Sequence, residues 1–100
     1  MVVISYRTIR TFFEEYPETT DALNNWYIIM ERSNFSNFNE MRKVFNSADA
    51  VGNDRYVFNI KGNHYRLIAL IHFRIRTVYV LFVGTHRQYD KIDARTIQYS

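Results

Sequence analysis

The sequence predicts an α+β fold in which helices pack on one face of a small antiparallel sheet. Its first half shows the apolar spacing of amphipathic helices, and its second half alternates apolar and polar residues as strands do. The composition is 47% hydrophobic with eight Phe and eight Tyr, enough for a packed and largely aromatic core. We therefore expect residues 1–100 to form one domain.

The first half of the chain is expected to be mainly helical. Residues 2–4 form a short apolar strand, and apolar residues then recur every three or four positions, as at Ile9 and Phe12. Ser5 is a suitable N-cap for the first helix, and Trp26 lies on the apolar face of the second. The expected helices span residues 6–16, 21–32 and 37–45.

The second half is expected to contain three consecutive strands. Residues 62–63, Gly and Asn, supply the tight turn of a hairpin between the first two. The third strand is apolar at both alternating positions, so we expect both of its faces to be buried. Residues 46–49 are predicted as a turn, and a short helical tail is expected around residues 87–97. The expected strands span residues 56–61, 64–73 and 77–83.

Strand alternation predicts one apolar and one basic face for this sheet. Tyr56, Phe58 and Ile60 share a side that we expect the helices to cover. The opposite positions carry cationic, amide and imidazole groups, and they form an open basic face if the helices cover only one side. These positions are Arg55, Asn59, Lys61, His64, Arg66, His72 and Arg74.

The net charge and the absence of several motifs limit which partners and which kinds of active site the chain can have. The net charge is +3 and ten of the thirteen cations are Arg, which permits an RNA partner and equally an acidic protein partner. The absence of Cys excludes disulfides and thiolate metal sites. The chain has no Gly-rich phosphate loop, no HExxH motif and no Gly-x-Ser-x-Gly nucleophile elbow. We therefore expect neither a metal nor another cofactor.

Membrane association is not expected either. No apolar stretch is long enough to span a bilayer, and no segment resembles a signal peptide.

RNA cleavage without a metal needs a base for the 2′-hydroxyl, cations for the phosphoryl oxygens and an acid for the leaving oxygen. Four residues at predicted strand ends supply these groups, and each also has a structural interpretation. Lys61 could be solvated beside its turn, and Arg66 could form a structural ion pair. His86 could be an ordinary turn residue, and Tyr89 could pack on the tail.

Two segments resemble the HigB-type toxins of bacterial toxin–antitoxin systems, within the RelE superfamily of mRNA interferases. They are residues 59–68 (NIKGNHYRLI) and residues 82–92 (FVGTHRQYDKI). Residues 3–12, the pair Trp26–Tyr27 and residues 47–53 fit the same pattern, so the resemblance covers essentially the whole chain.

The resemblance implies a compact RelE-like fold and a cytoplasmic bacterial endoribonuclease that cuts mRNA, typically on the translating ribosome. It also implies a neutralising HigA-type antitoxin with a helix-turn-helix domain, which would reach operator DNA and repress the operon together with the toxin.

The resemblance also implies roles for individual residues. Arg66 matches the strand Arg that contacts the scissile phosphate, and Lys61 matches a basic strand end. His86 stands where many relatives have a basic residue, and Tyr89 stands near a late catalytic Tyr. Lys61 or His86 would then be the base, and Tyr89 or His86 the acid. The candidate RNA contacts are Asn59, His64, Arg74, Arg76, Arg87 and Lys91.

A second hypothesis is a non-catalytic module that binds RNA or protein on its basic sheet face. Sheets that carry aromatic residues bind RNA in this way in other folds, and the aromatic fraction here is 17%.

Overall fold

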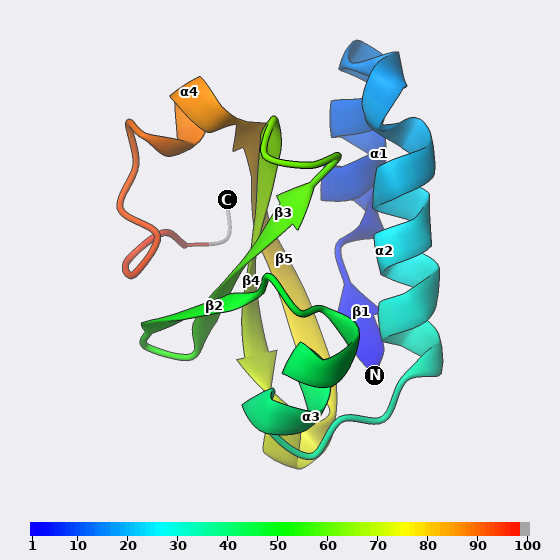
Figure 1. The fold of residues 1–100 in the computed structure, drawn as a ribbon, viewed down its shortest axis with the longest axis vertical. Helices are drawn as coiled ribbons and strands as arrows, with labels where there is room; N and C mark the ends of the chain where they lie inside the picture. The colour runs from blue at the N-terminus through cyan, green and yellow to red at the C-terminus, as the bar shows by residue number, and fades with distance from the viewer. Residues whose placement is uncertain (99–100) are drawn as a thin grey trace.

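A five-stranded sheet forms the centre of the structure, a computed structural model that describes residues 1–98 (Figure 1). Its strand order is β1-β5-β4-β3-β2. The strands are β1 (Val2–Ile4), β2 (Asp49–Gly52), β3 (Arg55–Ile60), β4 (Tyr65–His72) and β5 (Thr77–Thr85). The predicted α+β class is confirmed, but the sheet is mixed because β1 pairs parallel with β5. All the residues between these two strands supply the long connection that a parallel pair needs.

Helices cover one face of the sheet (Figure 1). Helix α1 (Tyr6–Glu15) and helix α2 (Thr20–Arg32) lie side by side there, joined by the 3-10 turn η1 (Pro17–Thr19). Helix α3 (Phe38–Val44) lies near the end of the sheet where the 3-10 turn η2 (Phe73–Ile75) joins β4 to β5. Helix α4 (His86–Tyr89) and the C-terminal segment lie on the other side of the sheet.

Three local predictions from the sequence are wrong in part. Ser5 is the N-cap residue of α1, as predicted, but its backbone is left-handed with φ 78° and its side chain makes no cap hydrogen bond. The turn predicted at residues 46–49 is present at residues 46–47, but residue 49 begins the edge strand β2, which was not predicted and has a bulge against β3. This strand is short and contains Asp and Gly, so its own residues do not favour a strand, and its pairing with β3 across the turn at residues 53–54 stabilises it. The predicted helical tail is a single helical turn, α4, followed by non-helical chain.

The main core lies between the helices and the sheet. Trp26, predicted to be buried, is 3% exposed and packs edge-on against Phe58 with ring centroids 5.3 Å apart. β5 contributes Val78 and Val80 to this core, whereas its Phe82 packs against a second cluster on the opposite face. Both faces of β5 are therefore packed, as its apolar pattern predicted.

The second cluster overturns the prediction of an open basic face. Val57 and Ile68 are buried beneath the C-terminal segment, which contributes Ala94. Arg55 does not face solvent freely, because its Nε and Nη2 donate to the carbonyl oxygen of Ile97 at 3.2 and 2.8 Å. Apolar residues alternate with the basic ones on this face, and burying them requires the cover that the tail supplies.

Within residues 1–98, no helix combines the length and the apolar character that crossing a membrane requires.

Candidate functional site

A row of three residues crosses the sheet on the face away from the helices. Asn59 on β3 pairs with Arg66 on β4, and Arg66 pairs with Gly84 on β5. A Cβ atom on Gly84 would overlap Cζ of the Phe82 ring. Only glycine therefore leaves room for this ring beside Arg66 in the row.

Arg66 carries a positive charge that pairs with no carboxylate among the residues that the structure describes. Its Nη1 donates to the carbonyl oxygens of Asn63 at 2.8 Å and Tyr65 at 3.3 Å. Its guanidinium carbon lies 5.8 Å from the centroid of the Tyr89 ring, within the range of a cation–π contact. None of the ion pairs within residues 1–98 includes Arg66. Of the two interpretations left open by the sequence, the structural ion pair is therefore wrong, and the group remains available to an anion.

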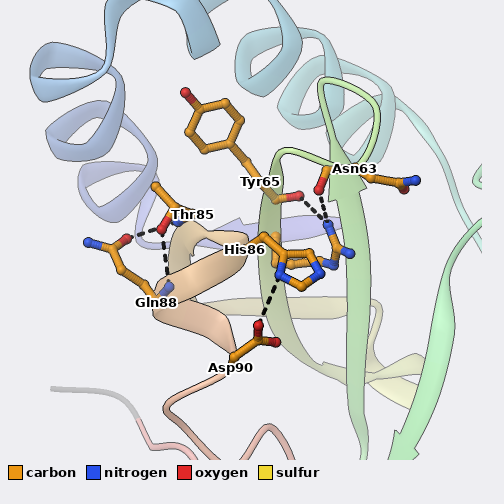
Figure 2. Close-up of polar contacts among 7 residues, drawn as sticks. Asn63, Tyr65, Thr85, His86, Gln88 and Asp90 are labelled. Carbon is orange, nitrogen blue, oxygen red and sulfur yellow. Dashed lines mark hydrogen bonds and ion pairs between the residues drawn. The ribbon is translucent and has the colours of Figure 1, made fainter.

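The β3–β4 turn fixes the position of this guanidinium. The side-chain amide of Asn59 donates to Oδ1 of Asn63 at 3.0 Å, while the Asn63 carbonyl oxygen accepts from Arg66. Lys61 and Gly62 complete the turn with φ values of 52° and 67°. Figure 2 shows Asn63 at this end of the sheet, with one dashed line to its carbonyl oxygen and a second to that of Tyr65. The sequence predicted the turn but gave Asn63 no functional role.

Helix α4 begins at the same end of the sheet with a reciprocal cap. The N–H of Gln88 donates to Oγ1 of Thr85 at 3.1 Å, and the N–H of Thr85 donates to Oε1 of Gln88 at 2.9 Å. The N–H of His86 donates to the carbonyl oxygen of His64 at 3.0 Å, which ties the start of α4 to the residue before β4. His64 therefore lies two residues before Arg66, and His86 lies two residues after Gly84, the partner of Arg66 on β5.

The imidazole of His86 has an acidic partner. Its Nδ1 lies 3.0 Å from Oδ2 of Asp90, four residues later, as Figure 2 shows. An Nδ1–H donated to the carboxylate leaves Nε2 free to accept a proton. Asp90 was missed in the sequence, although its spacing from His86 at the start of a helical turn was a usable signal.

Lys61 does not join Arg66, contrary to the prediction from strand alternation. Its Nζ donates to the carbonyl oxygen of Glu18 at 3.2 Å, and Glu18 belongs to η1 in the helical layer. The left-handed backbone at Lys61 ends the strand alternation, so its side chain leaves the face on which Arg66 lies. The hydroxyl of Tyr65 also donates to Glu18, at Oε2 and 2.5 Å, which fastens the hairpin to η1.

The hydrogen bond from Tyr65 lowers the pKa of Glu18, and the same bond raises the pKa of Tyr65. The stabilisation from Glu18 is therefore present above its ordinary pKa of 4.5 and is lost as the pH falls through the lowered value. The contribution of Tyr65 is present below its ordinary pKa of 10.0 and is lost as the pH rises through the raised value.

Tyr65→Phe should therefore lower the free energy of unfolding at neutral pH, and the difference from wild type should shrink on acidification below pH 4.5. Urea unfolding at several pH values measures this. Tyr16→Phe is the control, because the Tyr16 hydroxyl makes no hydrogen bond within the part of the chain that is described. A difference for Tyr65→Phe that stays constant between neutral and acidic pH would contradict the assigned role of Glu18.

The remaining candidates divide between the two ends of the sheet. Arg87 and Lys91 are exposed in and just after α4, near Arg66. At the opposite end, Arg76 donates from Nε to Oδ1 of Asn34 at 2.7 Å and from Nη2 to Oγ of Ser36 at 3.2 Å. The side chain of Arg76 therefore joins η2 to the loop before α3 by hydrogen bonds and has a structural role.

Two more candidates also lie far from Arg66. Arg74 is exposed in η2, and Nδ1 of His72 at the end of β4 lies 3.9 Å from Oδ2 of Asp54. The structure therefore gathers one group of polar residues, which we call the Arg66 corner. It consists of Asn59, Asn63, Arg66, His86, Tyr89 and Asp90.

No group of three or more His, Asp or Glu side chains suited to a metal ion occurs within residues 1–98.

Comparison with known proteins identifies the family. The sequence pattern of the HigB toxins, described as the RelE-like toxic component of a toxin–antitoxin system, matches residues 19–92. The mRNA interferase HigB of Escherichia coli O6:H1 is 32% identical over 94 residues, covering 92% of this chain and 91% of that protein. The mRNA interferase toxin HigB of Escherichia coli K12 is 28% identical over 92 residues, covering 90% and 88%. The chain therefore belongs to the HigB family of RelE-like toxins.

Proposed function

We propose that the chain is an endoribonuclease that cuts mRNA on the translating ribosome in the bacterial cytoplasm, without a metal ion in the chemical step. Arg66 is the observation that carries this proposal, since its guanidinium is held by backbone carbonyls and has no carboxylate partner within residues 1–98. The names of the similar proteins, mRNA interferases, support the same activity. Residues 1–100 would act as one toxin domain.

In the proposed reaction the 2′-oxygen of the mRNA attacks the adjacent phosphorus. Nε2 of His86 accepts the 2′-hydroxyl proton, while Asp90 holds the imidazole by Nδ1. The guanidinium of Arg66 binds the phosphoryl oxygens, which carry more charge in the transition state than in the substrate. The bond from phosphorus to the 5′-oxygen breaks, and the Tyr89 hydroxyl gives its proton to that oxygen. The products are a 2′,3′-cyclic phosphate and a 5′-hydroxyl end.

The roles of the other residues follow from their positions. Asn59 and Asn63 would keep the turn and the Arg66 guanidinium in place. His64, Arg87 and Lys91 are exposed and would contact RNA phosphates. Lys61 lies toward η1, so we assign it neither the base nor the acid role.

His86→Gln and Tyr89→Phe should each slow cleavage of ribosome-bound mRNA by roughly 10²–10⁴-fold, the usual range for a lost proton-transfer group. Single-turnover rates with purified protein and programmed ribosomes measure this. His72→Gln is the matched control, because His72 also lies beside an aspartate but at the opposite end of β4. If either variant cuts at the wild-type rate, that residue takes no part in proton transfer.

The requirement for the ribosome is tested with the same mRNA in two forms. We expect defined cuts when the mRNA is bound to translating ribosomes, and little or no cutting of the free mRNA by the same concentration of protein. Equal cleavage of both forms would refute ribosome dependence and leave the nuclease assignment intact.

The neutralising partner that we propose is a HigA-type antitoxin with a helix-turn-helix domain. The toxin would reach operator DNA only through this antitoxin, and the complex would repress its own operon. Membership in a toxin–antitoxin family supports the existence of the partner. Electrophoretic mobility of operator DNA tests the rest: the complex should shift the DNA, and the toxin alone should not.

A further inference from the structure

The C-terminal segment, residues 90–98, crosses the face of the sheet opposite to α1 and α2 (Figure 1). It begins directly after α4, whose Tyr89 lies beside Arg66, and its carbonyl oxygen at Ile97 accepts from Arg55, the first residue of β3. Asn59, the β3 partner of Arg66, follows Arg55 by four residues, which is about 13 Å along a strand. The segment therefore joins the Arg66 corner to the opposite end of β3.

Side chains, and not backbone pairing, hold the far end of this segment. It is neither helix nor strand, so no ladder of backbone hydrogen bonds fixes it to the sheet. Nε and Nη2 of Arg55 donate to the carbonyl oxygen of Ile97 at 3.2 and 2.8 Å. Nδ2 of Asn53 donates to the carbonyl oxygen of Arg95 at 2.9 Å. Nη1 of Arg55 also donates to the carbonyl oxygen of Asn53 at 2.9 Å, so the two side chains hold the segment together.

The middle of the segment links these hydrogen bonds to Tyr89. Ala94 is 9% exposed and is buried with Val57 and Ile68, and the Tyr89 ring packs against the same cluster. Helix α4 has only four residues, too few for a helix to hold its own conformation in water. Its reciprocal cap fixes the first residue, whereas Tyr89 is the last. The place of the Tyr89 ring over Arg66 therefore depends on contacts that the segment makes beyond α4.

We propose that Arg55 is a positioning residue for cleavage, because through the C-terminal segment it keeps the Tyr89 ring over Arg66. Two donors of its planar guanidinium meet one carbonyl oxygen, which restricts both the place and the direction of the segment. The inference rests on the proton-donor role of Tyr89 in the proposed function. Loosening the far end would let the Tyr89 hydroxyl leave the position from which it protonates the 5′-oxygen, while Arg66 would stay on its turn.

A double-mutant cycle measures this coupling. Arg55→Met keeps the length and the apolar stem of the side chain but removes its donors, and it should lower the single-turnover rate of mRNA cleavage roughly tenfold. In a Tyr89→Phe background the same change should have little or no further effect, because the hydroxyl that Arg55 positions is gone. Equal factors in both backgrounds would show that Arg55 acts on the RNA or on the fold, and would overturn the proposal.

Two further variants separate the hydrogen bonds from the charge. Asn53→Gly removes the second donor to the segment without straining the backbone, since φ of Asn53 is 53°, and it should lower the rate in the same way. Arg74→Met is the matched control, because it removes an exposed guanidinium from η2 and should cut nearly as fast as wild type. Equal losses for Arg55→Met and Arg74→Met would assign the effect to net charge and overturn the proposal.

Nuclear magnetic resonance reports the position of Tyr89 without the cleavage reaction. Nuclear Overhauser effects between the Tyr89 ring and the Arg66 side chain should be present in the wild type and lost in Arg55→Met. Those between Trp26 and Phe58 in the core should persist in both proteins. A contact between Tyr89 and Arg66 that survives in Arg55→Met overturns the proposal whatever the rates show. A Tyr89→Phe protein that cuts at the wild-type rate refutes the proton-donor role instead, and the resonance comparison still decides whether Arg55 holds Tyr89.

Discussion

Arg66→Ala is expected to lower the rate of mRNA cleavage by about 10²–10³-fold and to prevent growth arrest when the chain is expressed. Arg66 lies between Asn59 and Gly84 in the row across the sheet, and its guanidinium lies over the Tyr89 ring. Removing the guanidinium removes the cation that would stabilise the negative charge developing on the phosphoryl oxygens in the transition state. Because Arg66 is only half-buried and bonds to carbonyl oxygens of its own turn, the variant should fold and still bind the antitoxin.

Two further variants test whether the geometry and the location of the Arg66 charge matter. Arg66→Lys keeps the charge but loses the planar, two-pronged contact with phosphate, so its rate should fall between those of wild type and Arg66→Ala. Arg74→Ala removes an exposed Arg from the far end of the sheet and should cut nearly as fast as wild type. A folded Arg66→Ala protein that remains fully toxic would remove Arg66 from the mechanism.

Phe58→Ala is expected to have the largest effect on stability, lowering the free energy of unfolding by about 3–5 kcal/mol. The Phe58 ring is 2% exposed and lies between Trp26 and Phe45, with both centroids 5.3 Å away. Truncation would remove two edge-on aromatic contacts and leave a cavity between β3 and the helices. Urea denaturation measured by Trp26 fluorescence reports this change.

The control for this change is a substitution of an exposed apolar residue. Val44 on α3 is 51% exposed, so Val44→Ala should change the free energy of unfolding by about 0.5 kcal/mol or less. Equal, small losses for Phe58→Ala and Val44→Ala would show that the aromatic cluster does not hold the sheet to the helices.

The sequence predicted those parts of the fold that depend on neighbours along the chain. The apolar spacing of Ile9 and Phe12 placed α1 correctly, and Gly62 marked the turn between β3 and β4. The edge strand β2 was missed although it is also local, because it pairs with β3 across a turn at residues 53–54. Residues such as Asp49 and Gly52 do not favour a strand by themselves.

At the candidate site, too, the sequence predicted some positions correctly and others not. Alternation along β4 brought Arg66 to the face away from the helices, and its residue type suggested phosphate binding. Alternation failed at Lys61, because a single left-handed residue redirects the side chain toward Glu18. It also did not show that the C-terminal segment would cover the basic face and bring Tyr89 to Arg66, since that contact joins residues far apart in the sequence.

The central claim is that this chain cuts mRNA at the Arg66 corner, and mapping the 5′ ends of cellular mRNAs after brief induction tests it most directly. We predict new, defined 5′-hydroxyl ends within translated regions for the wild type, and none for the folded Arg66→Ala variant. A non-catalytic binding module would slow translation without creating such ends. Wild-type expression that arrests growth while leaving mRNAs uncut would contradict the account.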